Sequence, residues 1–291
     1  MADVPIGVLG GSGLYAMAEL ADVEERRIST PFGEPSDAIT IGSLGGTRVA
    51  FLPRHGRGHR LLPAEIPVRA NIYALKSLGV RWLLGASAVG SMREEIEPLH
   101  MVIPDQIIDR TRGRVSTFFG GGLVGHVSLA QPFCPTLSRL LGDAAERAGA
   151  TVHRGGTYLC MEGPQFSTRA ESLLYRSWGV SIIGMTAMPE ARLAREAELH
   201  YALIAQSTDY DCWREGEEAV SADLVVANVA KNIATVRRVL PELVPRVPTE
   251  LEDACTSALA HAIQTAPEAI NPDAVERLGL IYEKSARGSQ G

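Results

Sequence analysis

The sequence predicts an α/β protein in which helices cover the faces of a sheet. Apolar segments with the length of buried strands alternate along the chain with segments whose apolar residues recur at helical spacing. Five of the expected strands run into glycine-rich or polar clusters, at 10–13, 54–60, 87–91, 185–186 and 208–211. Ligands bind at the carboxyl ends of strands in open α/β sheets, so we expect these clusters to converge on one site.

The individual elements follow from the same patterns. In the helix expected at 64–78, Ile66, Ala70 and Leu78 fall on one face, and Gly79 supplies the stop. The expected strands are 4–10, 38–42, 47–53, 80–86, 101–108, 151–160, 180–185 and 201–207. The other expected helices are 135–148, 168–178, 189–198, 221–240 and 249–264. The glycine-rich stretch 110–131 lacks a strong period and predicts a long functional loop.

Composition argues against several classes of protein. The formal net charge of −6 lacks the basic excess expected of a protein that binds nucleic acid or a membrane surface. The sequence has no run of 18 apolar residues and no signal-peptide pattern, so we expect a cytoplasmic protein without a membrane span. The lack of linkers and repeats favours a single domain over residues 1–284, with 285–291 as a flexible tail.

The four cysteines, Cys134, Cys160, Cys212 and Cys255, lie tens of residues apart. This spacing resembles neither a zinc motif nor a dense disulfide framework, and no other metal-binding motif occurs. We therefore expect reduced, mostly buried thiols and no bound metal.

The first glycine-rich cluster is GGSG at 10–13. Backbone N–H groups of such a turn can bind an anion, and the Ser12 hydroxyl adds a donor. The cluster lacks the ending of a P-loop and the last glycine of a nucleophile elbow. Residues 11–16 also fit a degenerate dinucleotide-binding fingerprint, and a plain tight turn would have the same sequence. An anion site, a dinucleotide site and a turn all stay open here.

Residues 54–60, RHGRGHR, form a dense basic loop in an acidic protein. Arginine presents a planar fork of donors that suits a phosphate or a carboxylate. Arg54 and His55 come directly after a strand, so we expect these two residues to bind phosphate. The rest of the run is interpreted as solvated surface charge.

Asp209 and Asp211 come directly after the strand expected at 201–207 and flank Tyr210. Carboxylates at i and i+2 of an extended segment point to the same side. Two such groups that lie close together can keep one acid protonated at neutral pH, as protonation of a leaving base requires. An Asx-turn or a helix N-cap would use the same residues, and spacing alone does not separate these interpretations.

Many short motifs of the chain resemble the methylthioadenosine phosphorylase family. They are IGVLGGSGLY at 6–15, TPFGEPSDA at 30–38, RHGRGH at 54–59, GSMREEI at 90–96, AQPFCP at 130–135, EGPQFSTRAES at 162–172, GMTAMPEA at 184–191 and TDYDCW at 208–213. They agree with the family in order and spacing over most of the chain. The resemblance implies a single-domain, trimeric nucleoside-phosphorylase fold with a central mixed, twisted sheet flanked by helices.

The resemblance implies cleavage of 5′-methylthioadenosine by inorganic phosphate, a co-substrate, with no cofactor. Phosphate would attack C1′ of the ribose while Asp209, paired with Asp211, protonates purine N7. An aspartate also accepts from a 6-amino group, which favours adenine over a 6-oxopurine. The implied phosphate site is Ser12, Arg54, His55, Ser87, Ala88 and Thr186. The implied nucleoside site is Phe166, Ser167, Met185, Asp209, Tyr210 and Asp211.

Ala222, Val225 and Val226 resemble the apolar wall that holds the methylthio group, although a core-facing stripe would have the same spacing. Ala222 is smaller than the residue that many family members have, so we expect other 5′-deoxy-5′-substituted adenosines to fit as well. His126 resembles a residue that reaches the site of a neighbouring subunit, which implies a homotrimer. A hydrolytic nucleosidase, a 6-oxopurine nucleoside phosphorylase and a non-catalytic nucleotide-binding module are the competing functions.

Overall fold

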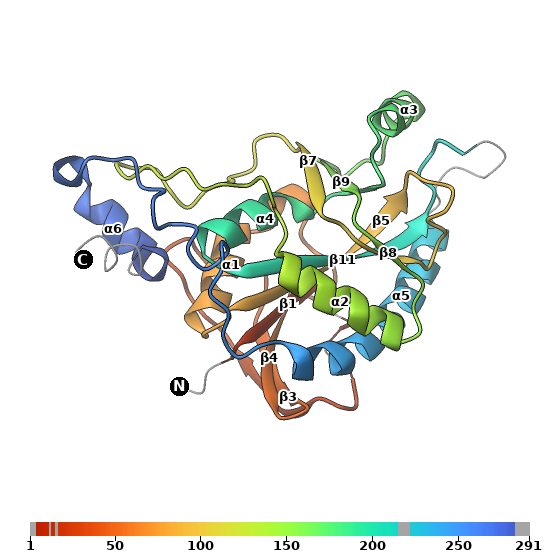
Figure 1. Cartoon of the computed structure of the whole chain (residues 1–291), viewed down its shortest axis with the longest axis horizontal. Helices are drawn as coiled ribbons and strands as arrows, with labels where there is room; N and C mark the ends of the chain where they lie inside the picture. Colours follow the sequence, from red (N-terminus) through yellow and green to blue (C-terminus); the bar gives the residue numbers. More distant parts are fainter. Residues whose placement is uncertain (1–3, 12, 15–16, 215–221, 283–291) are drawn as a thin grey trace.

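In the computed structural model of the chain, residues 4–11, 13–14, 17–214 and 222–282 are described, with residues 222–226 described by their backbone alone. Ser12 and the predicted tail at 285–291 lie outside the described residues. The expected α/β class with a mixed sheet flanked by helices is confirmed (Figure 1). The single domain over residues 1–284 stays a prediction.

The sheet contains parallel and antiparallel pairs. Its strands are β1 (Ile6–Gly10), β2 (Ala21–Arg26), β3 (Ile39–Leu44), β4 (Thr47–Pro53), β5 (Trp82–Ser91), β6 (Met101–Ile103), β7 (Gln106–Arg110), β8 (Val152–Arg154), β9 (Thr157–Met161), β10 (Ile182–Gly184) and β11 (His200–Asp209). The main order is β2-β3-β4-β1-β5-β10-β9-β7, while β11 pairs with β5 and β6, and β6 with β8. The long strand β5 therefore contacts β1, β10 and β11, which places it at the centre of the sheet.

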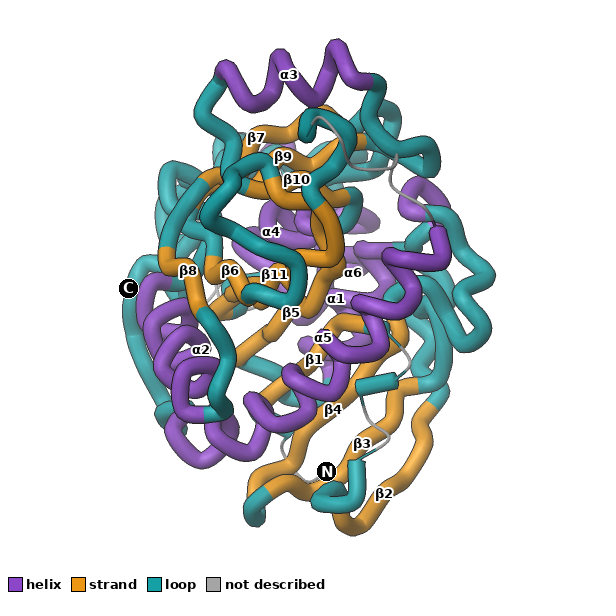
Figure 2. Tube along the Cα trace, turned by 90° about the vertical axis from the view of Figure 1, so that its right-hand side faces the viewer, coloured by secondary structure: helices purple, strands orange, loops and turns teal. Residues whose placement is uncertain are grey.

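Helices cover both faces of this sheet. They are α1 (Val68–Ser77), α2 (Pro135–Arg147), α3 (Arg169–Ser177), α4 (Ala187–Glu196), α5 (Ala222–Leu243) and α6 (Pro272–Leu278), with single 3-10 turns at Pro63–Glu65, Val244–Arg246, Pro267–Ala269 and Gly279–Ile281. Helix α2 packs on α5 and β11, whereas α1 packs on α4. Helix α3 stands at the periphery, beside the ends of β7 and β9 (Figures 1 and 2).

Two large apolar clusters hold these layers together. One joins α1 and α4 to the sheet through residues such as Ile72, Leu75 and Leu193, and the other joins α2 and α5 through Leu141 and Val239. Burial of this many apolar side chains is the main stabilising contribution to such a fold. Within the described part of the chain, no helix is long and apolar enough to cross a membrane.

Some predicted strands are interrupted or were missed. The strand expected at 101–108 splits into β6 and β7 around Pro104, which has no N–H to donate to a sheet. The strand expected at 151–160 splits at Gly155 and Gly156, which both have positive φ. Strand β2 was not predicted because its residues are mostly exposed and lack apolar alternation. Strand β5 extends to Ser91, so the cluster at 87–91 lies in the strand and not after it.

The helix expected at 249–264 is wrong, because this segment consists of turns. In a helix, backbone N–H groups donate to backbone carbonyls, but here some of them donate to side-chain carboxylates instead. Cys255 N donates to Asp253 Oδ1 at 2.7 Å, and Leu259 N donates to Glu198 Oε1 at 3.0 Å. Helix α6, which follows this segment, was not predicted.

The end of β11 carries an irregularity. Its register with β5 is regular from His200 to Ser207, which pairs with Val89, but Asp209 then pairs with Gly90. Thr208 is therefore an extra residue, as in a β-bulge. The bulge places the Asp209 side chain beside a residue that has none.

Candidate active site

Of the phosphate-binding residues expected from the sequence, Arg54 and His55 lie directly after β4, beside the end of β1. Gly10 pairs with Pro53, and Arg54 N donates to Gly10 O at 2.9 Å. Gly11 is exposed, and a Cβ added there would meet nothing within 4 Å. The two strand ends thus form one open turn region, which lies beside the middle of β5 (Figure 1).

Arg54 is buried at this turn region and is hydrogen-bonded to the protein. Its guanidinium forms a two-pronged ion pair with Glu190 of α4, in which Nε donates to Oε1 and Nη2 donates to Oε2 at 3.1 Å. Nη1 donates to Ala86 O at 2.9 Å, and Nη2 also donates to Leu9 O at 3.1 Å. Burial would lower the pKa of Arg54, but the Glu190 carboxylate beside it raises that pKa overall. Arg54 therefore stays charged and fixed in position.

Glu190 is a site residue that was not assigned from the sequence. It is only 1% exposed, and its Oε2 also accepts a hydrogen bond from Tyr201 Oη at 2.9 Å. A glutamate inside a predicted helix is ordinarily a surface residue, so its pattern gave no signal. Its partnership with Arg54, 136 positions away, exists only in the folded chain.

Ser87 of β5 and Thr186, which precedes α4, form a pair of hydroxyls. Their oxygens lie 3.0 Å apart, and both residues are buried. Two adjacent hydroxyls can both donate to one anion when they rotate away from each other. Ala88, the next residue of β5, is exposed.

His55 is held in one tautomer. Its Nδ1 lies 2.8 Å from Leu61 O, and because a carbonyl only accepts, Nδ1 carries the proton. Burial, together with the nearby Arg54, lowers the pKa of His55 to about 4. The ring is therefore neutral near pH 7, with Nε2 as an acceptor. It also stacks on His59 at a centroid distance of 4.3 Å.

The carboxylates at the end of β11 form a turn. Asp211 N donates to Asp209 Oδ1 at 2.8 Å, and Thr208 Oγ1 donates to Asp209 Oδ2 at 2.7 Å. Asp211 has a φ of +52°, so the segment is not extended as the i, i+2 argument assumed. The Asx-turn alternative is therefore the observed backbone conformation. It brings the two residues together, since a Cβ at Gly90 would contact Asp209 Oδ1 at 3.1 Å and Asp211 Cβ at 3.4 Å.

The segment 162–168 lies between these carboxylates and Met185. Cys212 Sγ donates to Ser167 O at 3.3 Å, which connects the segment to the Asp211 turn. At its other end, a Cβ at Gly163 would lie 2.5 Å from Met185 Sδ. Phe166 is 53% exposed, which is unusual for a large aromatic side chain. Phe166, Ser167 and Met185 thus lie in one region with Asp211.

Arg114 connects the segments on either side of Met185, and the sequence did not predict this role. Its side chain is 5% exposed and binds the Glu162 carboxylate at 3.1 Å. Nη1 also donates to Met185 O at 2.7 Å and to Met188 O at 3.0 Å. Arg114 belongs to the stretch 110–131 that the sequence predicted as a functional loop. Its hydrogen bonds join the loop to both segments around Met185.

Other expected residues lie elsewhere or are not described. The Tyr210 ring packs in an apolar cluster with Tyr175 and Trp213, and its hydroxyl donates to Glu94 O at 3.3 Å. His126 is exposed in a segment that pairs with residues 262–264, and its N–H donates to Ala262 O at 2.8 Å. This segment approaches α6, on the opposite side of the molecule from the end of β11 (Figure 1). Ser12 and the side chains of Ala222, Val225 and Val226 lie outside the described residues.

The backbone of α5 still shows where that helix begins. Asn228 Nδ2 donates to Thr208 O at 2.8 Å, and Asn232 Nδ2 donates to Ser207 O at 2.9 Å. These two bonds dock α5 against the bulge of β11. The first turns of α5, from Ala222, therefore begin near Asp209.

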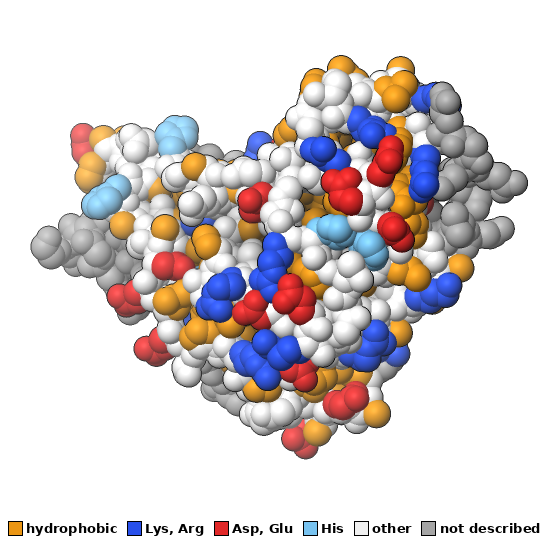
Figure 3. Space-filling view, turned by 45° about the vertical axis from the view of Figure 1, so that its right-hand side comes forward, with side chains coloured by type: hydrophobic (Ala, Val, Ile, Leu, Met, Phe, Trp, Pro, Cys, Tyr) orange, Lys and Arg blue, Asp and Glu red, His pale blue; other side chains and the backbone are white. Residues whose placement is uncertain are grey.

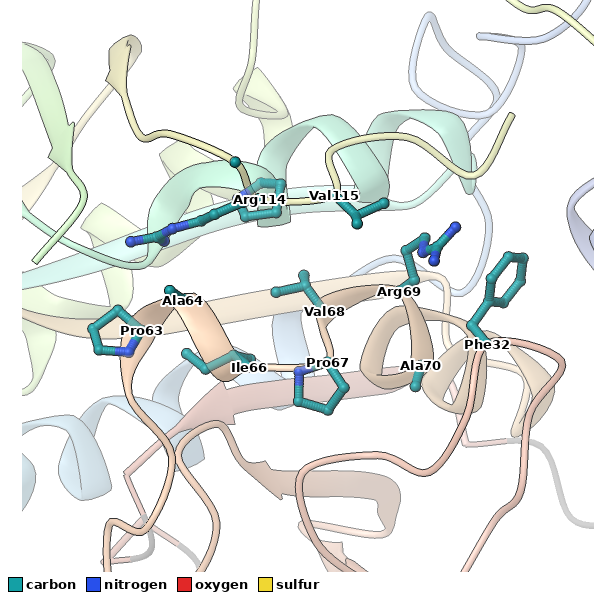
Figure 4. Close-up of a pocket in the computed structure, with 12 residues that line it drawn as sticks. Phe32, Pro63, Ala64, Ile66, Pro67, Val68, Arg69, Ala70, Arg114 and Val115 are labelled. Atoms are coloured by element: carbon teal, nitrogen blue, oxygen red, sulfur yellow. The ribbon is translucent and has the colours of Figure 1, made fainter. Parts of the chain in front are cut away.

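A cavity of about 190 Å³ borders the loop that contains Arg114 but is not lined by the expected site residues. It lies between the turn that contains Pro63 and the start of α1 on one side, and Arg114 and Val115 on the other (Figure 4). Arg114 is thus the residue shared by the cavity wall and the Met185 region. On the molecular face shown in Figure 3, acidic and basic side chains of the described residues are interspersed.

Potential metal ligands come together in a different place. Among the described residues, a set of ligating side chains is formed by Cys134, His200, Asp253 and Cys255. His200 begins β11, whereas Asp209 ends it. The set therefore lies at the opposite end of the strand from the candidate active site.

Comparison with known proteins defines the class. The sequence model described as "Phosphorylase superfamily" matches residues 5–245. The chain is 58% identical to S-methyl-5′-thioadenosine phosphorylase of Geobacter sulfurreducens, over 95% of this chain and 97% of that protein. It is 56% identical to the protein of the same name from Gloeobacter violaceus, over 96% and 95%. The chain therefore belongs to the phosphorylase superfamily, within its S-methyl-5′-thioadenosine phosphorylase family.

Solved structures agree. A methylthioadenosine phosphorylase sourced from an antarctic soil metagenomic library is 50% identical, with a TM-score of 0.92 over 97% of this chain and 99% of that chain. A mutant of adenosine/methylthioadenosine phosphorylase from Schistosoma mansoni, solved in complex with methylthioadenosine, is 36% identical, with a TM-score of 0.82 over 88% and 96%. The nucleoside-phosphorylase fold implied by the sequence motifs is confirmed.

Proposed function

We propose that the chain cleaves 5′-methylthioadenosine with inorganic phosphate to give adenine and 5-methylthioribose 1-phosphate. Relatives named S-methyl-5′-thioadenosine phosphorylase, which are 50–58% identical over nearly the whole chain, support this reaction. The observation that carries it in the structure is the placement of two polar groups along β5. The buried hydroxyl pair of Ser87 and Thr186 is at one position, and the carboxylates at Gly90 are at another.

The spacing of these groups suits a nucleoside. Ser87 and Gly90 are three residues apart in one strand, which corresponds to about 10 Å. A ribose between a phosphate on its far face and a base spans a similar distance. Phosphate would bind at the hydroxyl pair and the Gly11 turn, and the base would bind between Phe166 and Asp209. The sugar would then lie over β5, beside Met185.

The reaction proceeds by displacement at C1′. A phosphate oxygen forms the new bond to C1′, and the electron pair of the C1′–N9 bond leaves with the purine. Asp209 delivers a proton to N7, so adenine departs neutral. The hydrogen bonds that Asp209 accepts from Thr208 Oγ1 and Asp211 N orient its carboxyl group. Asp211 orients Asp209 through its backbone N–H.

Arg54 acts on phosphate mainly through its position and charge. Four of its five N–H groups are bonded to Glu190, Ala86 and Leu9 within the described part of the chain. Only one N–H, on Nη1, is left for an anion. The neutral His55 ring accepts at Nε2, which suits the hydroxyl of a protonated phosphate. Most of the groups that donate directly to phosphate are therefore Ser12, Ser87, Thr186 and backbone N–H groups.

Dependence on phosphate tests the reaction class. We expect adenine release from methylthioadenosine to require phosphate and to yield the sugar phosphate in equal amount. The measurement is product analysis in dialysed, phosphate-free buffer with and without added phosphate. Equally fast release without phosphate would identify a hydrolytic nucleosidase instead.

A panel of nucleosides tests the substrate. We expect methylthioadenosine to be cleaved with a higher kcat/KM than methylthioinosine or inosine, because Asp209 accepts from a 6-amino group. A preference for inosine would identify a 6-oxopurine nucleoside phosphorylase. Adenosines with other 5′ substituents would show how much room Ala222 leaves beside Val225 and Val226.

We propose further that the chain is a cytoplasmic homotrimer that needs no cofactor for this reaction. The position of His126 supports the trimer, because a residue on the α6 side of one subunit reaches an active site only in another. Light scattering coupled to size-exclusion chromatography would test it. A monomer that retains full activity would contradict a role for His126 of a partner.

A further inference from the structure

A cluster of four potential ligands lies at the amino end of β11, about 30 Å along the strand from Asp209. One ligand atom from each of Cys134, His200, Asp253 and Cys255 lies within 4.8 Å of all the others. Cys134 Sγ is 3.3 Å from His200 Nδ1, which is 3.6 Å from Asp253 Oδ2. In a tetrahedral zinc site the S···N and N···O edges are about 3.6 and 3.3 Å. The two observed separations each differ from these edges by about 0.3 Å, so small side-chain shifts bring the ligands to the distances of such a site.

We propose that Cys134, His200, Asp253 and Cys255 bind one structural Zn²⁺ ion. Two thiolates, an imidazole and a carboxylate form a four-ligand set of the kind that zinc prefers over harder cations. Three of the four residues are almost fully buried, and Asp253, with its side chain 26% exposed, gives the ion a path from solvent. Because all four positions are filled by the protein, the site has no open position for catalysis.

The ligands are held in place by the surrounding structure. Cys134 caps α2, with its N–H bonded to Tyr201 O at 2.7 Å and its Sγ facing Leu137 N. The His200 ring stacks on Trp82 at a centroid distance of 3.9 Å. The bond from Cys255 N to Asp253 Oδ1 fixes the turn that carries the other two ligands. Ligands oriented in this way lose little entropy when a metal binds.

The charges of the cluster favour a divalent cation. With Zn²⁺, two thiolates and one carboxylate carry three negative charges, of which the ion neutralises two. The guanidinium of Arg195, which lies near Cys255, offsets the third.

A zinc ion here would explain how an irregular segment is held. Asp253 and Cys255 belong to the 249–264 segment of turns, outside the residues 5–245 that match the superfamily. Cys134 and His200 belong to α2 and β11 inside that match. The ion would bind the 249–264 segment to α2 and β11, in the way that structural zinc stabilises small domains. The proposal does not depend on the reaction that the enzyme catalyses.

Metal content of the full chain tests the proposal. Protein expressed with zinc and purified without chelators is expected to contain one equivalent of zinc per chain, measured by inductively coupled plasma mass spectrometry. Cys134→Ser and Cys255→Ser should bind zinc more than about tenfold more weakly. Cys160→Ser, which changes a buried thiol bonded to Met188 O, is the matched control and should keep the metal. Serine at position 134 is a good helix cap, so that variant is expected to fold.

Cobalt provides a measurement on the unmodified chain. Apoprotein titrated with Co²⁺ should develop the visible bands of a tetrahedral site and thiolate-to-cobalt absorption, and a chelator should lower the Tm of the zinc-loaded protein. Reduced protein that takes up neither metal overturns the proposal. A Cys134–Cys255 disulfide in protein isolated without added oxidant, or zinc retained by both cysteine variants, would overturn it as well.

Discussion

The two halves of the candidate active site are built differently. On the phosphate side, Arg54 is bonded to Glu190 and Ser87 to Thr186, and all four residues are buried. On the base side, Asp209 and Asp211 lie in a turn, and Phe166 is 53% exposed. The first half is a fixed electrostatic environment, whereas the second has side chains that a substrate must cover. Charge stabilisation and base recognition therefore respond differently to mutation.

The largest effect is expected for Asp209→Asn. An amide keeps the size of the side chain but cannot protonate N7, so kcat/KM for methylthioadenosine should fall about 10²–10⁴-fold. The KM for phosphate should change little, because the hydroxyl pair lies elsewhere on β5. Steady-state kinetics with each substrate varied would measure both. Unchanged turnover would refute Asp209 as the acid and remove the distinction between the two halves.

Glu190→Gln should be the most destabilising change on the phosphate side. It leaves the buried Arg54 charge without its partner, which costs about 3–5 kcal/mol in comparable buried pairs. Urea denaturation would measure the free energy of unfolding. The matched control is Glu242→Gln, because Glu242 pairs with the exposed Arg246 and its loss should cost about 0–1 kcal/mol. Equal effects of the two substitutions would show that the phosphate side is not rigidly paired.

The pH dependence of the free energy of unfolding should reveal the titration of His55. Its pKa is lowered to about 4 in the folded chain from 6.5, so the unfolded chain binds more protons between these values. Its contribution to stability is complete above pH 6.5 and is lost as the pH falls towards 4, by up to about 3 kcal/mol. His55→Asn keeps a donor for Leu61 O and should flatten this part of the curve. A parallel curve in the variant would show that His55 does not titrate in this way.

Gly90→Ala should give the smallest effect, and only on the base side. The new Cβ would lie 3.1 Å from Asp209 Oδ1, a tight contact that the turn can relieve by a small shift. We expect kcat/KM for the nucleoside to fall about tenfold, within the 1–3 kcal/mol typical of overpacking. The KM for phosphate serves as the internal control. A larger change in phosphate KM than in nucleoside kcat/KM would contradict the separation of the halves.

The sequence predicted what periodicity and local chemistry determine. The strands that lead into Arg54 and Asp209 and the helices α2, α3 and α5 were found, because their apolar residues recur at the spacing of each element. The motifs also brought Ser87, Thr186 and Arg54 into one expected site, and the structure places them together. The family assignment rests on these motifs and is confirmed.

What sequence could not show depends on distant contacts. Glu190 looked like a surface glutamate until the fold placed it against Arg54, and Arg114 was one of several arginines in an aperiodic loop. The 249–264 segment has the composition of a helix, but Asp253 and Glu198 take its backbone donors. The cluster around His200 joins residues as far apart as 134 and 255, which no spacing rule for metal motifs covers.

The extra residue in β11 sets limits on the length of chain that can vary in relatives. If Thr208 were deleted, Asp209 would still face Gly90, because the strand register would simply become regular. The hydrogen bonds from Thr208 Oγ1 to Asp209 Oδ2 and from Asn228 Nδ2 to Thr208 O would be lost. A single deletion at this point would therefore preserve the pairing with β5 but release both the carboxylate and helix α5. Relatives should keep this extra residue, while loops far from β11 are free to change length.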